Sequence, residues 1–168
     1  DEIQDFIVDR ARNHYRDQGF STELINATLS SSWDTLPDLD SRTRALSEFM
    51  GQDAAASLAA ANKRIGNILR KSDSDVSKKI NENRLTLDEE RDLFDKLSTL
   101  ETELKPLLDT ADYAASLALL AGLKQPVDAF FDSVMVMDED PELRANRLAL
   151  LARVKTLFDH IADLSVLG

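Results

Sequence analysis

Apolar residues recur at helical spacing along nearly the whole chain, and this pattern limits the possible folds more than any other feature. No stretch alternates apolar and polar side chains for long enough to predict a strand. With only 5 Gly and 4 Pro among 168 residues, few positions interrupt a helical backbone. We therefore predict an all-α fold, an antiparallel helical bundle of about seven to nine helices that forms a single domain over residues 1–168.

The apolar periodicity also sets the expected helix boundaries. It predicts helices over about 3–18, 21–29, 39–50, 53–71, 86–108, 112–123, 126–137 and 141–164. Residues 30–38 are expected to form a loop that contains Trp33, and residues 72–84 a weakly structured segment. The helix at 53–71 is rich in Ala, which permits close approach between helices, so we expect it to be a central element.

Capping signals and inner apolar stripes support these boundaries. The expected caps are Gly19 at the end of the first helix, Ser21, Asp53 and Asp140 as N-caps, Pro141 as a first helical residue, and Thr86 with Glu89 as a capping box. The expected inner stripe of the first helix contains Ile3, Phe6, Ile7, Ala11 and either His14 or Tyr15. The seven Phe and three Met fall mainly on such stripes, and we interpret them as core residues.

Residues that could carry catalysis or bind a metal are scarce. The chain has no Cys, which excludes a thiolate nucleophile or a thiolate metal site. Neither His14 nor His160 has further ligands at metal spacing, and the acidic cluster 138–140 lacks the spacing of a calcium loop. We therefore predict no catalytic residue and no metal site. The longest apolar run is too short for a transmembrane helix, and no signal peptide is visible.

Charge is distributed unevenly along the chain. The net charge of −11 opposes broad affinity for nucleic acid. Residues 1–84 contain 12 Lys or Arg against 14 Asp or Glu, whereas residues 85–168 contain 8 against 17. Within the first half, residues 63–84 contain 7 basic and 3 acidic side chains. A polyanion would therefore contact the first half of the chain.

Two groups of basic and polar residues are candidates for RNA contact. One follows the helix at 53–71 and contains Lys63, Arg64, Asn67, Arg70 and Lys71, and the other, in the first helix, contains Arg12, Tyr15 and Arg16. Arg pairs with phosphate or stacks on a base, Asn reads base edges, and Tyr offers a stacking face. The same pattern is more often that of a solvated helix face, and spacing alone does not decide between the two.

Several long motifs resemble one protein family. They are FIVDRARNHYRDQGF (6–20), ANKRIGNIL (61–69), QPVDAFFDSVMVMDEDPELRANRLALL (125–151) and LFDHIADLSVL (157–167), in this order. Together they are similar to the C-terminal domain of bacterial glycyl-tRNA synthetase beta subunits, and the resemblance covers almost the whole chain. On this basis we expect the chain to be a part of a longer beta subunit.

The resemblance implies a DALR-type anticodon-binding domain that recognises the anticodon arm of tRNA(Gly). It implies two further partners, the alpha subunit of the synthetase and the remainder of the beta subunit, and no membrane or DNA partner. In this family the alpha subunit holds the active site for glycine and ATP with Mg²⁺, so this domain would need no cofactor and catalyse nothing. The implied location is the cytoplasm. The alternative is a helical protein–protein interaction bundle that docks other synthetase domains or subunits.

The resemblance also implies which candidate residues contact phosphates and which contact bases. Phosphate contacts are expected from Lys63, Arg64, Arg70 and Lys71, and base stacking or base-edge contacts from Arg12, Tyr15, Arg16 and Asn67. Arg144 and Arg147 lie near the start of the last helix, where positive charge opposes the helix dipole. We therefore expect a local acidic partner for them, such as Asp138 or Asp140, in preference to RNA.

Overall fold

The computed structural model describes residues 2–72, 76 and 79–167, and within them it contains eight α-helices, three short 3-10 helices and no strand. The α-helices are α1 (Glu2–Asp17), α2 (Thr22–Leu29), α3 (Leu36–Phe49), α4 (Asp53–Lys71), α5 (Asp88–Asp109), α6 (Tyr113–Leu120), α7 (Lys124–Ser133) and α8 (Pro141–Asp159). The 3-10 helices are η1 (Glu82–Arg84), η2 (Ala121–Leu123) and η3 (Leu164–Val166). The prediction of an all-α fold is confirmed.

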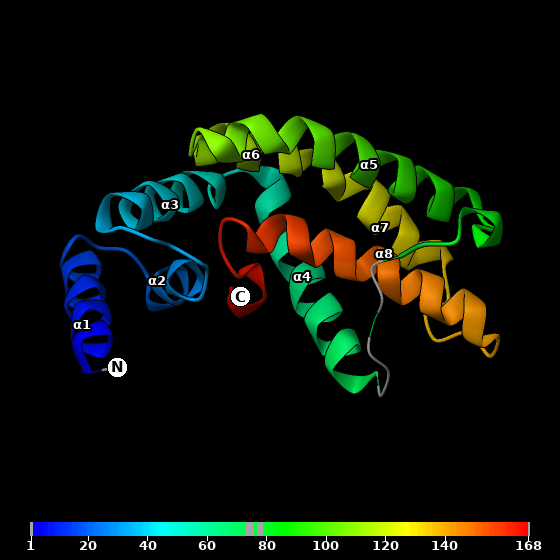
Figure 1. The fold of residues 1–168 in the computed structure, drawn as a ribbon, viewed down its shortest axis with the longest axis horizontal. Helices are drawn as coiled ribbons and strands as arrows, with labels where there is room; N and C mark the ends of the chain where they lie inside the picture. Colours follow the sequence, from blue (N-terminus) through cyan, green and yellow to red (C-terminus); the bar gives the residue numbers. More distant parts are fainter. Residues whose placement is uncertain (1, 73–75, 77–78, 168) are drawn as a thin grey trace.

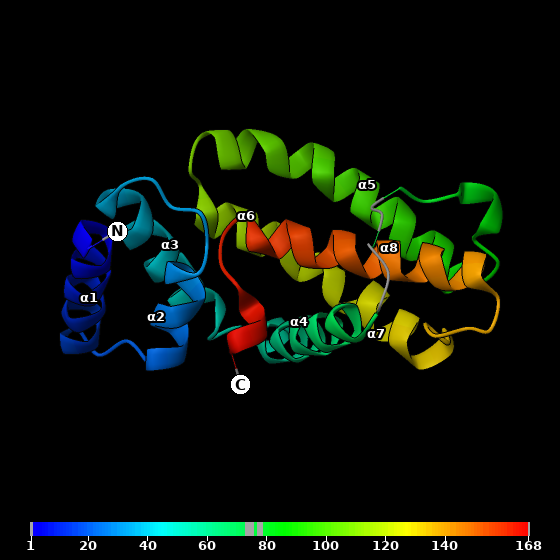
Figure 2. The same cartoon turned by 60° about the horizontal axis from the view of Figure 1, so that its bottom comes forward.

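Helix α8 is the axis around which the other long helices pack. It lies between α4 and α5, and α7 packs against both of these helices (Figures 1 and 2). Helices α1 to α3 form one end of the molecule, where α3 joins the rest by packing against α6. The chain then returns at its carboxyl end, because η3 packs between α2 and α4.

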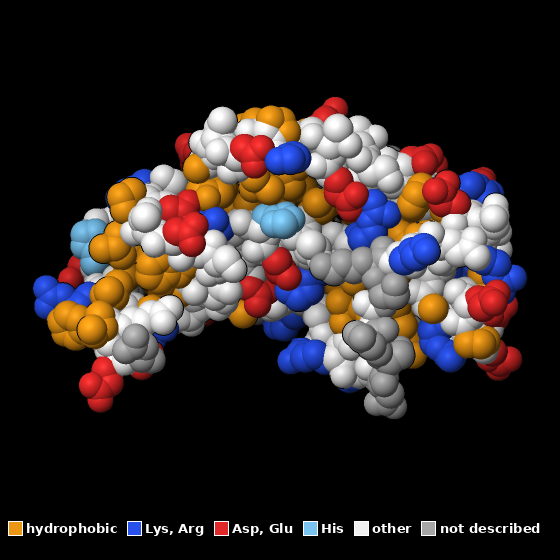
Figure 3. Space-filling model, in the orientation of Figure 1, with side chains coloured by type: hydrophobic (Ala, Val, Ile, Leu, Met, Phe, Trp, Pro, Cys, Tyr) orange, Lys and Arg blue, Asp and Glu red, His pale blue; other side chains and the backbone are white. Residues whose placement is uncertain are grey.

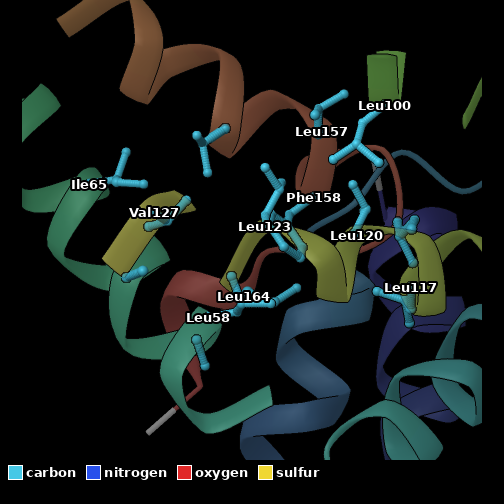
Figure 4. Close-up of a cluster of buried hydrophobic side chains, with 14 of the residues drawn as sticks. Leu58, Ile65, Leu100, Leu117, Leu120, Leu123, Val127, Leu157, Phe158 and Leu164 are labelled. Atoms are coloured by element: carbon cyan, nitrogen blue, oxygen red, sulfur yellow. The ribbon is translucent and has the colours of Figure 1, made fainter. Parts of the chain in front are cut away.

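The core contains leucines and aromatic residues from segments far apart in the sequence. Side chains of α4, α5, α6, α7 and α8 converge in Figure 4, together with Leu123 of η2 and Leu164 of η3. In α4 the buried alanines, Ala55, Ala59 and Ala61, allow close packing against α7, α8, η2 and η3. The expectation that this helix is central is confirmed.

Several capping predictions are confirmed. Gly19 ends α1 with a φ of +91°, a conformation that other residues rarely adopt. Ser21 caps α2 by accepting a hydrogen bond from the Leu24 N–H at 3.2 Å. Asp140 caps α8 by accepting from the N–H groups of Glu142 and Leu143, and Pro141 is the first helical residue. These local signals act within one turn, so the sequence contains all the information they need.

Other capping predictions are wrong by one residue. The N-cap of α4 is Gln52, whose side chain makes no capping hydrogen bond, so Asp53 belongs to the first turn. The carboxylate that caps α5 belongs to Glu90 and accepts from the Leu87 N–H at 2.9 Å, so Glu89 has no part in it. Spacing favoured Glu89, but Glu90 is the residue that tertiary packing buries.

Two predicted boundaries shift because capping residues intervene. Helix α3 begins at Leu36 and not at 39, since the Thr35 hydroxyl accepts from the Asp38 N–H at 3.3 Å and shortens the expected loop. Helix α8 ends at Asp159 and not near 164. The chain turns there, and Asp163 begins η3 while its own N–H donates to the Ala27 carbonyl at 2.9 Å.

The segment after α7 is not helical, although the pattern predicted a helix to 137. Helix α7 ends at Ser133, Val134 adopts an extended conformation, and residues 136 and 137 lie in a turn. Val134 and Val136 are buried, whereas Met135 and Met137 are 68% and 54% exposed. The interpretation of all three Met as core residues is therefore wrong for these two.

The predicted inner stripe of α1 is only partly buried. Ala11 and Tyr15 lie in a small core with Ile25 and Leu39. Ile3, Phe6 and Ile7 are 72%, 63% and 37% exposed, so the prediction that they are core residues is wrong. Within the described residues, α1 packs mainly against α2 and therefore has no partner for its amino-terminal half.

A buried ion network joins the two halves of the carboxy-terminal hairpin to α5. Arg147 is 4% exposed, and its Nε donates to Glu90 at 2.7 Å while its Nη1 donates to Asp138 at 3.0 Å. The same Nη1 donates to the Met135 carbonyl at 2.7 Å. Arg144 donates to the backbone carbonyl of Asp138. The expectation of a local acidic partner is confirmed for Arg147, and Glu90 is an additional partner that the sequence did not indicate. It is wrong for Arg144, whose partner is a backbone carbonyl.

Removing the charge of Glu90 should destabilise the fold strongly. Glu90→Gln leaves Arg147 buried with its nearest anion lost, and breaking such a pair costs about 3 to 5 kcal/mol. The measurement is the free energy of unfolding by chemical denaturation. Asp109→Asn is the control, because the side chains of Asp109 and its partner Lys105 are 62% and 76% exposed, and an exposed pair contributes less than about 1 kcal/mol. Equal losses in the two variants would contradict the structural role of Glu90.

The difference in stability between the native chain and Glu90→Gln should also depend on pH. Burial alone raises the pKa of Glu90, but hydrogen bonds from Arg147, the Leu87 N–H and Thr86 outweigh it and lower the pKa. The carboxylate therefore contributes fully above its unfolded pKa of about 4.3, and the contribution is lost as pH falls through the lowered folded value. Unfolding free energies measured from pH 7 down to acid should converge for the two proteins.

Candidate nucleic-acid interface

The carboxy-terminal half of α4 presents most of the predicted RNA-binding residues to solvent. Lys63, Arg64, Asn67, Arg70 and Lys71 are all exposed. Arg64, Asn67 and Lys71 follow one another at intervals of three and four residues and so share one side of the helix. Blue side chains are visible over this part of α4 at the lower edge of Figure 3. The structure thus brings together the five candidates that belong to this helix.

Contacts within this surface orient its side chains. The Arg64 guanidinium lies over the ring of Phe131 in α7, 4.1 Å from the ring centroid. Arg70 donates through Nη2 to the side-chain oxygen of Asn67 and through Nε to the Gly66 carbonyl at 3.3 Å. Phe131 is half-buried, so its ring supports one face of the guanidinium plane. The sequence could not indicate this pair, because 67 residues separate its members.

The cations of this surface differ from most others in how their charge is compensated. Among the described residues, no carboxylate forms an ion pair with Arg64, Arg70 or Lys71. By contrast, Arg84 pairs with Asp140 at 2.5 Å and Lys105 pairs with Asp109 at 2.9 Å. As far as the described residues go, these three charges are therefore left for an external anion.

The helix dipole explains only part of this arrangement. Arg70 and Lys71 lie in the last turn of α4, where the unpaired carbonyl groups favour positive charge. Arg64 lies two turns earlier, outside the range of this effect. Its position depends on the ring of Phe131 instead.

The three candidates in α1 are not equivalent. Tyr15 is 4% exposed, and its ring contacts the rings of His14 and Phe20 edge-on. Burial, together with the nearby carboxylate of Asp40, raises the pKa of Tyr15 to about 12. The prediction that Tyr15 offers a face for base stacking is therefore wrong, since the core already covers the ring.

Arg12 and Arg16 remain at the surface but lie away from α4. Arg12 is partly buried, with Nη1 3.9 Å from Asp9, and Arg16 is exposed. Helix α2 and the carboxy-terminal segment lie between α1 and α4 in both views of the fold (Figures 1 and 2). The two groups of candidates therefore form two separate surfaces and not one continuous ridge.

The described part of the chain contains neither a metal-binding cluster nor a membrane-spanning helix. No group of three or more His, Asp or Glu side chains there is arranged to hold a metal ion. None of the described helices has the length and apolar character required to cross a membrane. The exposed half of α4 is the surface best suited to an anionic partner, because its cations are accessible and an arginine plane is supported from behind.

Comparison with known proteins places the chain among tRNA synthetase components. Residues 58–168 match the model of the DALR anticodon binding domain. Glycine–tRNA ligase beta subunits of Aliivibrio fischeri, Sodalis glossinidius and Escherichia coli are 45%, 46% and 44% identical to it over 99% of its length. The chain spans about a quarter of the length of these relatives, 24% in each case.

The burial of the tyrosines can be tested by alkaline titration. Burial also raises the pKa of Tyr113, the second of the two Tyr, so phenolate absorbance of the folded chain should stay low through pH 10. Chain unfolded in denaturant should instead titrate near the ordinary value of about 10. Helical circular dichroism recorded at each pH defines the range in which the chain is folded. Ionisation of one tyrosine near pH 10 in the folded chain, absent from Tyr15→Phe, would contradict the burial of Tyr15.

Proposed function

The chain belongs to the DALR anticodon-binding domain family, and from this premise we propose that it is the tRNA anticodon-arm recognition module of a glycine–tRNA ligase beta subunit. Its identity of about 45% to such beta subunits over 99% of its length supports the proposal. The module supports the glycylation of tRNA(Gly) and catalyses no step itself. ATP, Mg²⁺ and the active site belong in this proposal to the alpha subunit, and the complex works in the cytoplasm.

The observation that carries the proposal is the group of uncompensated cations on α4. In a chain with a net charge of −11, carboxylates are abundant, and many arginines and lysines pair with one. Arg64, Arg70 and Lys71 lack such a partner among the described residues and are exposed. Phosphate groups supply the missing negative charge, and they provide most of the affinity of RNA-binding surfaces.

We propose a role for each of these side chains. Arg70 and Lys71, at the end of the helix, contact phosphates. Arg64 has one face of its guanidinium plane on Phe131, which leaves the other face for an unstacked base of the anticodon loop. Asn67 lies between them and reaches a base edge. Lys63 adds positive charge on the same half of the helix, and Arg12 and Arg16 form a second, separate contact.

Neutralising cations on α4 should reduce the salt dependence of tRNA binding. Each phosphate contact to single-stranded RNA contributes about 0.7 to the slope of log affinity against log salt. Arg70→Gln with Lys71→Gln should therefore lower the slope by about 1.4 in a beta subunit that contains this chain. Affinity for tRNA(Gly) is measured between low and physiological salt.

Lys105→Gln is the control, because it removes one positive charge from an exposed site on α5, as each α4 substitution does on α4. Its slope should equal that of the unmodified protein. If Lys105→Gln and the α4 variants behave alike, or if tRNAs with other anticodons bind equally well, the cations of α4 serve solubility alone. That outcome would favour the alternative of a protein–protein interaction bundle.

A further inference from the structure

The amino-terminal half of α1 exposes a row of large apolar side chains. Ile3, Phe6 and Ile7 occur at positions i, i+3 and i+4 and are 72%, 63% and 37% exposed. Leu36, at the start of α3, is 52% exposed and extends the same surface. Figure 3 shows this apolar group at the end of the molecule that contains α1. We call these four residues the α1 apolar face.

The α1 apolar face is grooved on both sides. Ile7 and Leu36 line two adjoining grooves of about 880 and 580 Å³. The first also contains Phe6, Arg10, His14 and Pro37, and the second contains Ile3, Val8, Leu29 and Trp33. A ridge between two grooves fits a partner that inserts its own apolar side chains on either side, as a packed helix does.

Charge around the second groove argues against RNA as the occupant. Among the described residues that line this groove, one is charged, and it is the acidic Asp34. The exposed carboxylates of Glu2 and Asp5 lie on the same turns of α1 as the apolar row. Phosphate groups would be repelled here, whereas a protein segment with apolar and basic side chains would be complementary.

The comparisons indicate where such a segment comes from. The match to the anticodon-binding domain begins at residue 58, within α4, so α1 to α3 lie outside it. The beta-subunit relatives nevertheless match 99% of the chain, and they are about four times as long. Helices α1 to α3 are therefore shared with beta subunits but are not explained by the anticodon-binding domain itself.

We propose that the α1 apolar face docks an amphipathic segment from the remaining part of the same beta-subunit polypeptide. This inference rests on the part of the proposed function that makes the chain a piece of a beta subunit, and it does not depend on tRNA binding. Docking buries Ile3, Phe6 and Ile7, which gives α1 the core that its periodicity predicted. It also fixes the orientation of the domain within the subunit.

The absence of Cys from the chain allows a direct test with introduced thiols. In a beta subunit that contains this chain and whose other cysteines have been replaced, Phe6→Cys is compared with Ala118→Cys, a control at an exposed position of α6. Labelling of Phe6→Cys by a maleimide should be at least about ten-fold slower, equivalent to a docked state favoured by about 1.4 kcal/mol. Both thiols should react at the same rate in denaturant.

A second variant distinguishes docking from local effects of the thiol. Phe6→Asp should disrupt docking, so that Ile3→Cys, slowly labelled by itself, reacts as fast as Ala118→Cys. The same Phe6→Asp should leave the salt dependence of tRNA binding unchanged. Failure of the tRNA proposal would instead appear in the variants of α4 and leave the protection of Phe6→Cys intact.

Three outcomes would overturn the inference. Equal labelling of Phe6→Cys and Ala118→Cys would show an open face. Protection that increases with protein concentration would assign the face to a second copy of the subunit. Protection that appears only after addition of tRNA or of the alpha subunit would assign it to that partner.

Discussion

The fold depends on a single buried cation. Arg147 belongs to α8, and its guanidinium donates to Glu90 at the start of α5 and to both the Met135 carbonyl and Asp138 in the segment after α7. Burial opposes its charge, but the carboxylates of Glu90 and Asp138 outweigh burial and raise the pKa of Arg147. These hydrogen bonds hold the three segments in one register, because a shift of any segment would leave a buried charge without its partner.

The regions of the molecule differ in how far their charged and apolar side chains find partners within the chain. Several of the described cations pair with a carboxylate one helical turn away, as Lys124 does with Asp128. In α4, Arg64, Arg70 and Lys71 form no such pair among the described residues, and α1 exposes apolar side chains. Both features lie outside α5 to α8, in the half of the chain that is less acidic. A packed helical core thus supports two surfaces whose charges or apolar side chains have no partner among the described residues.

Local signals predicted more of this structure than distant ones did. The end of α1 and the starts of α2 and α8 follow from Gly19, Ser21 and Asp140, each acting within a turn. The pairing of Glu90 with Arg147 and the contact of Arg64 with Phe131 require contacts across the fold, which periodicity does not encode. The error at α1 has another origin. Its apolar spacing correctly indicated a face suited to burial, but no part of the described chain covers it.

The segment at 134–137, with its alternating burial, has a consequence for chemical damage. Its alternation turns the thioethers of Met135 and Met137 outward, so oxidants reach them before they reach the core. A sulfoxide at either position would project into water, whereas the backbone carbonyl of Met135, which accepts from Arg147, would be unaffected. Met135 and Met137 therefore place two oxidisable sulfur atoms next to the hydrogen bonds of Arg147, and their oxidation leaves those hydrogen bonds intact.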